Sequence, residues 1–76
     1  MSTVEKKFAR LAQELDYCFP ALDLHFNLEH NSGMARFFPG NRPDKILEIS
    51  LLEGEALDLI NEATLALKEM FSFFDA

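Results

Sequence analysis

The chain has 76 residues and a formal net charge of −6, and 49% of its residues are apolar. This length predicts one domain, residues 1–76, and the apolar share, which includes eight phenylalanines, excludes a disordered chain. No apolar run approaches the ~20 residues needed to cross a bilayer, and a single cysteine cannot form an internal disulfide. We therefore expect a cytoplasmic protein that does not bind membranes.

The segment from Ser2 to Asp16 has the periodicity of a helix. Ser2, followed three residues later by Glu5, predicts an N-terminal capping box. Pro20 cannot continue the helix, so we expect residues 17–21 to form a connection. Spacings of four, three and four place the apolar residues of this segment on one helical stripe: Val4, Phe8, Leu11 and Leu15.

An apolar–polar alternation of period two begins at Leu22 and predicts a first strand over residues 22–29. Residues 30–33, with the sequence HNSG, favour a turn because Asn and Gly accept positive φ angles. Residues 34–38 then predict a returning strand, and residues 45–51, which are rich in leucine and isoleucine, predict a third strand.

The last predicted element is a helix over residues 53–74, where apolar residues recur in steps of four and three. The order α-β-β-β-α predicts an α+β fold, in which a three-stranded antiparallel meander packs against two helices.

If residues 30–33 form a four-residue turn, Glu29 pairs with Met34, whereas a slip of one residue would exchange the two faces of the sheet. With the four-residue turn, Phe26 and Phe37 point to the core, and the opposite face of the sheet is mixed. An apolar patch with a polar rim is typical of a contact surface, although a helix packed on this face would make the patch part of the core. The apolar residues of this second face are Met34, Phe38 and Ile46.

The predicted second helix has a wider apolar arc than one sheet covers. Four positions in seven are mainly apolar, whereas a core-facing helix needs about three. The first helix could cover the excess within one chain, but we expect contact with a second copy or a partner. The residues we expect in this interface are Leu57, Leu59, Phe71, Phe73 and Phe74.

Chemical signatures are sparse. Cys18, His25 and His30 are spaced unlike any common zinc site, and the aromatic neighbours of Cys18 indicate a small buried hydrophobic residue. Asp23 and Glu48 could share a sheet face, but no nucleophile or oxyanion signature accompanies them. We therefore expect no enzyme activity, no catalytic residue, no metal and no cofactor.

Arg36, Arg42 and Lys45 form a cationic group around the loop of residues 39–44. Exposed amides at Gly40 beside these side chains would suit a phosphate or carboxylate. The Gly-rich phosphate motifs are absent, and a tight turn with solubilising charges is the plainer interpretation.

Residues 53–76 carry six acids against Lys68 alone, and the acidic balance disfavours direct binding to DNA or RNA. We expect a small acidic interaction protein, a homodimer that binds and modulates another protein as an inhibitor, adaptor or accessory subunit, of the kind that phages or plasmids encode. One alternative is a chaperone-like escort that holds a partner segment against the open strand face or a sheet edge. Another is a binder of a small anionic ligand or nucleotide at the cationic group.

Overall fold

The computed structural model describes residues 3–71 and contains the predicted order of elements, α-β-β-β-α. The α+β fold with a three-stranded antiparallel meander is therefore confirmed. The elements are α1 (Thr3–Cys18), the short 3-10 helix η1 (Pro20–Leu22), β1 (Leu24–Glu29), β2 (Met34–Pro39), β3 (Leu47–Ser50) and α2 (Ala56–Met70).

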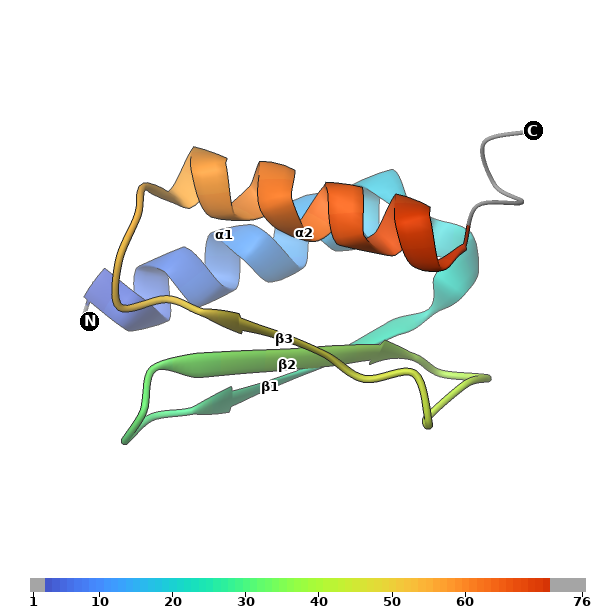
Figure 1. Ribbon diagram of the computed structural model, residues 1–76, viewed down its shortest axis with the longest axis horizontal. Coiled ribbons are helices and arrows are strands. Elements are labelled where there is room, and N and C mark those ends of the chain that lie inside the picture. The colour runs from blue at the N-terminus through green and yellow to red at the C-terminus, as the bar shows by residue number, and fades with distance from the viewer. Residues whose placement is uncertain (1–2, 72–76) are drawn as a thin grey trace.

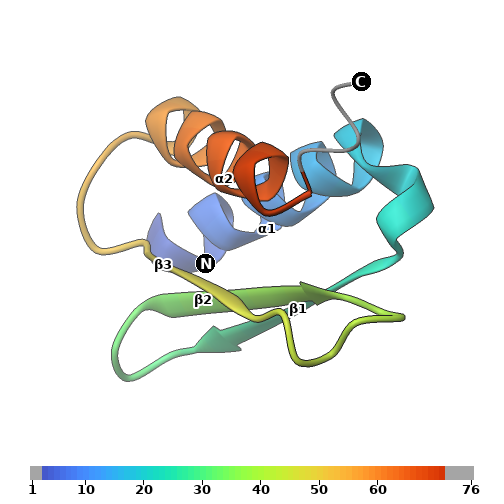
Figure 2. The ribbon, with the colours of Figure 1, turned by 45° about the vertical axis from the view of Figure 1, so that its right-hand side comes forward.

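Both helices lie on the same side of the sheet (Figure 1). They run next to each other above the strands, with α1 in contact with β1 and α2 in contact with β3 (Figure 2). Within residues 3–71, no element covers the other side of the sheet. The arrangement with one helix on each face is therefore excluded for this part of the chain.

The hairpin register is the predicted one. Glu29 pairs with Met34, and Phe26 pairs with Phe37. The turn is closed by Gly33, whose N–H donates to the Glu29 carbonyl at 2.9 Å. Gly33 has a φ of +67°, and an added Cβ would also have to displace the exposed Leu52 side chain, 2.6 Å away, so glycine is favoured there.

The core lies between the helical layer and the sheet. Leu11 and Leu15 of α1, Phe37 of β2 and Leu67 of α2 are almost inaccessible to solvent. Phe37 is buried and Phe26 packs against the core, as predicted. The other apolar residues of this region that are buried or packed against the core are Leu22, Leu24, Leu28, Ala35, Leu47, Ile49 and Leu51.

Element boundaries differ from the predictions where backbone geometry overrides the apolar pattern. Leu22 is buried from η1 rather than from a strand, because Asp23 takes a left-handed φ of +51° and interrupts the extended chain. Gly54, with a φ of +91°, precedes the start of α2 at Ala56. The predicted capping residue Ser2 lies outside the described residues.

Pro39, which the composition of its segment places in a loop, is the last residue of β2. It pairs with Leu24 and is buried. β3 begins at Leu47, opposite Phe37, so Pro39 lies beyond the end of β3. Proline has no backbone N–H, but no residue of β3 lies opposite Pro39, so no hydrogen bond to β3 is lost.

Replacing Leu15 by alanine tests the position of the core. Its side chain is fully enclosed, so Leu15→Ala should lower the free energy of unfolding by about 2–5 kcal/mol. Leu65→Ala removes the same atoms from an exposed site on α2 and should change this free energy by less than about 0.5 kcal/mol. Urea denaturation measures both, and similar losses would contradict the observed packing.

Candidate functional site

The uncovered face of the sheet is the main candidate site. Side chains alternate between the two faces of a strand, so the residues between the buried ones form this surface, which we call the open face. Its members are His25, Asn27, Glu29, Met34, Arg36, Phe38, Glu48 and Ser50, with Ile46 immediately before β3.

An ion pair crosses the centre of the open face. The Arg36 Nε donates to the Glu48 Oε2 at 2.6 Å, and both side chains are half exposed. Asn27 lies opposite Arg36 on β1. The hydrogen bond from Arg36 to Glu48, followed by the negative charge of Glu48, raises the pKa of Arg36. The guanidinium is therefore charged at any pH at which the protein would be studied.

Two stacked rings form one end of the open face. The His25 and Phe38 ring centroids are 5.3 Å apart and the planes are inclined by 9°. The His25 Nε2 lies 3.7 Å from the Asp23 Oδ2. Extending the register of β2 and β3 places Ile46 opposite Phe38, and Ile46 is 52% exposed. Phe38 and Ile46 therefore form an apolar platform, which His25 extends.

Gly40 allows the next loop to approach this platform. Its N–H donates to the Asp23 carbonyl at 2.9 Å. An added Cβ would lie 3.0 Å from the Asp23 backbone carbonyl oxygen, tighter than most Cβ contacts, and would displace the exposed ends of Asp23 and His25, whose Oδ2 and Nε2 would lie at 2.7 and 3.0 Å.

The predicted apolar patch is divided into two parts. Met34 and Phe38 lie on the open face on either side of Arg36. Both are partly buried. The ion pair of Arg36 with Glu48 therefore separates Met34 from the apolar platform.

Most of the described residues expected to form an interface on the second helix are covered by the chain itself. Leu59 and Phe71 belong to the core, with 6% and 5% of their surfaces exposed, whereas Leu57 is 57% exposed. The sheet covers one part of the wide apolar arc and α1 covers the adjacent part. Phe73 and Phe74 lie outside the described residues.

The cationic group is not one cluster of free charges. Arg36 is held by Glu48 in the centre of the open face. Arg42 and Lys45 are exposed in the loop after β2, where the Lys45 N–H donates to the Arg42 carbonyl. An anion bound by all three residues would share the Arg36 guanidinium with Glu48, which already accepts from its Nε.

Cys18 is exposed, so the prediction that it is buried was wrong. It follows Leu15 on the same side of the helix, but it is the last residue of α1 and lies beyond the core. His25 and His30 are separated by the length of β1. Across residues 3–71, no three or more His, Cys, Asp or Glu side chains are grouped closely enough to hold a metal ion.

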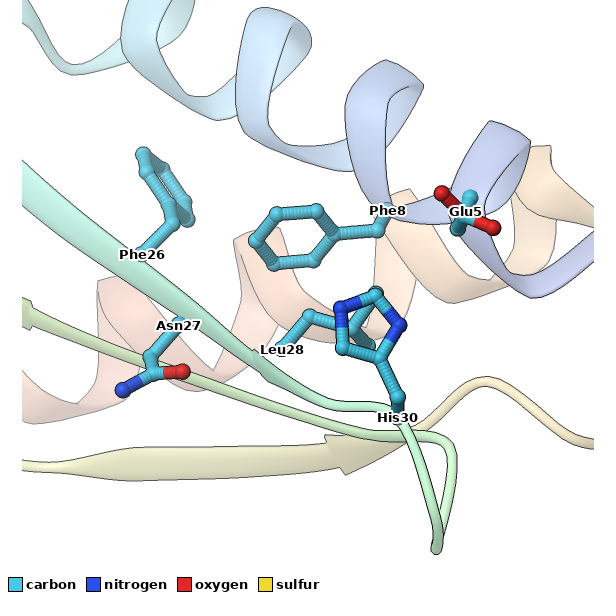
Figure 3. A pocket seen from close by; sticks show the side chains of 6 residues that line it. All are labelled: Glu5, Phe8, Phe26, Asn27, Leu28 and His30. Atoms are coloured by element: carbon cyan, nitrogen blue, oxygen red, sulfur yellow. The ribbon is translucent and has the colours of Figure 1, made fainter. Parts of the chain in front are cut away.

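A hollow beside β1 was not predicted from the sequence. It has a volume of about 390 Å³ and is lined by Glu5 and Phe8 of α1 and by Phe26, Asn27, Leu28 and His30. The Phe8 ring projects from α1 toward β1, and His30 extends from the turn toward Glu5 (Figure 3). The periodicities of Phe8, Phe26 and Leu28 indicate core residues. The sequence signal for the hollow was the predicted strand order, because the first strand of a three-stranded meander lies at an edge of the sheet.

Comparison with protein-family models, curated proteins and solved structures found no match to this chain. In the part of the chain that the structure describes, neither helix has the length and apolar character needed to traverse a bilayer. The functional interpretation therefore depends on the surface geometry described above.

Replacing Gly40 by alanine tests the close approach of the loop to the platform. The new methyl group would press against the Asp23 carbonyl oxygen, so Gly40→Ala should lower the free energy of unfolding by about 1 kcal/mol. Asn41→Ala changes the adjacent exposed residue and should have little effect. Thermal and urea unfolding measure both, and equal stabilities would show that the contact at Gly40 is unimportant.

Proposed function

We propose that this protein is a non-enzymatic interaction protein that binds another protein through the open face and thereby modulates it. The observation that carries the proposal is the packing of both helices on one side of the sheet. This packing leaves Phe38 and Ile46 at the surface instead of in the core.

The open face combines two features of protein interfaces. The apolar platform supplies an aromatic anchor, and aromatic anchors contribute a large share of binding energy. The ion pair of Arg36 with Glu48 supplies both signs of charge beside this anchor, which favours correct orientation of a partner. A partner with a complementary apolar patch would bury Phe38 and Ile46 together.

The negative charge of the chain favours a partner whose contact surface is surrounded by basic residues. A net charge of −6 on 76 residues attracts positively charged surfaces over about a Debye length and raises the association rate. By occupying such a surface on its partner, the protein would act as an inhibitor, an adaptor or an accessory subunit.

The non-enzymatic part of the proposal is supported by the exposure of a carboxylate and imidazole pair at one end of the open face. Asp23 and His25 lie 3.7 Å apart, and both side chains are more than half exposed. Neither residue lines the hollow beside β1, and an open surface does not exclude water from a reacting group.

A reducing, cytoplasmic location fits the exposed thiol of Cys18, since oxidising compartments favour disulfides over free thiols. A second copy of the chain is the alternative occupant of the open face. Occupancy by a second copy would make the protein the homodimer expected from its sequence.

Two substitutions of Phe38 test this function. The first identifies the partner: a photo-reactive phenylalanine at position 38, in cells that naturally express the chain, should form an adduct that mass spectrometry identifies. With the purified partner, Phe38→Asp should weaken binding by about 30-fold, the loss expected for a central aromatic anchor.

Leu65→Asp is the matched control, because it places the same charge on an exposed apolar site of α2, in the helical layer. It should change the affinity less than twofold. Circular dichroism checks that both variants fold. Equal losses in the two variants would contradict binding through the open face, and an adduct between two copies would identify a homodimer instead.

A further inference from the structure

The outer edge of β1 is the second notable surface. The strand order β1-β2-β3 places β1 at an edge of the sheet. The Gly33 carbonyl accepts a hydrogen bond from the Leu51 N–H at 2.8 Å, so residue 33 directs its carbonyl to the β3 side. Backbone groups alternate between neighbouring strands. Met34, Arg36 and Phe38 therefore bond to β1.

The same alternation defines which groups of β1 are available. His25, Asn27 and Glu29 lie opposite the residues of β2 that bond to β1, so their N–H and C=O groups are used within the sheet. The N–H and C=O groups of Phe26 and Leu28 point away from β2. Among residues 3–71, no strand pairs with this edge.

Apart from the charge of Glu29 at its last residue, the edge lacks the features that normally prevent an added strand. Protected edges carry proline, lysine or a bulge, or they are very short. β1 has the sequence LHFNLE over six residues, and its pairing with β2 is continuous. An extended segment can therefore bond to the outward backbone groups of β1 as a further strand.

The hollow between α1 and β1 adjoins these backbone groups. Phe26 and Leu28 contribute their side chains to it, and Phe8 of α1 closes it from the helical side (Figure 3). Its volume of about 390 Å³ lies in the range of ligand-binding pockets. Apolar side chains on the inner face of an added strand would enter this hollow.

The charges around the edge select one class of occupant. Asp23 and Glu29 flank the two ends of β1, and Glu5 lines the hollow. The sequence contains no lysine or arginine from residue 17 to residue 35. Lys7 of α1 is directed elsewhere, since its Nζ donates to the Leu51 carbonyl. A second copy would bring the same acids together, whereas a basic segment would be attracted.

We propose that the outer edge of β1 binds an extended segment of a partner protein in which apolar residues alternate with lysine or arginine. The segment adds a fourth strand to the sheet. Its backbone bonds to Phe26 and Leu28, its apolar side chains enter the hollow, and its basic side chains lie near Asp23 and Glu29. This surface is distinct from the apolar platform, so the two proposals can fail independently.

A displayed library of random 12-residue peptides, selected against the full chain, tests the occupant. Enriched peptides should alternate apolar residues with lysine or arginine. Synthetic copies labelled with fluorescein then allow Kd measurements by anisotropy. A copy with every basic residue replaced by glutamate should bind at least about tenfold more weakly. Absence of enrichment, or enrichment without alternation or basic residues, would overturn the proposal.

Two variants of Leu28 test the backbone contact. Leu28→Pro removes the outward N–H and breaks no bond to β2, because proline is tolerated at an edge whose N–H faces solvent. Leu28→Ala removes the same apolar contact and keeps the N–H. The enriched peptide should bind Leu28→Pro about tenfold more weakly than Leu28→Ala. Equal affinities for the two variants would overturn strand addition.

Two further measurements distinguish the β1 edge from the apolar platform, and a partner segment from a second copy of the chain. Phe38→Asp should leave peptide affinity within twofold of the original, which distinguishes this edge from the apolar platform. Light scattering on a Cys18→Ser background, which prevents disulfide-linked dimers, should give the same mass for Leu28→Pro and Leu28→Ala. A dimer that only Leu28→Pro dissociates would identify a second copy as the occupant and overturn the proposal.

Discussion

The packing of both helices against one face of the sheet is the constraint on which the rest of the structure depends. Each strand of the meander has one apolar side, and the register aligns these sides around Phe37. Burial of apolar surface is the main favourable term in folding, so α1 and α2 both pack there through Leu11, Leu15 and Leu67. Within residues 3–71, no further element covers the opposite face.

The fold leaves two surfaces with different chemistry. The open face carries an ion pair beside an apolar platform, a combination that favours recognition of a folded partner surface. The edge of β1 offers unpaired backbone groups beside an apolar hollow with acidic surroundings. That combination favours an extended basic segment. The open face follows from the packing of both helices on one side, and the free edge follows from the position of β1 at the end of a three-stranded meander.

Sequence alone was sufficient for the order of the elements and the hairpin register, but not for every element boundary. The alternation from Leu22 to Leu28 and the short turn at residues 30–33 leave one pairing that keeps the apolar sides together. Long-range packing could not be predicted in the same way. Leu59 and Phe71 are buried because α1 lies next to α2, a neighbour that helical periodicity does not reveal. The exposure of Cys18 likewise depends on where the core ends.

The most direct test of one-sided packing is the accessibility of methyl groups, measured by NMR in the presence of a soluble gadolinium chelate. The structure predicts strong relaxation enhancement for the methyl groups of Met34 and Ile46 on the open face, and little for those of Leu15 and Leu67 in the core. Protection of Met34 and Ile46 equal to that of Leu15 would contradict the account, because it would mean that the second face of the sheet is covered.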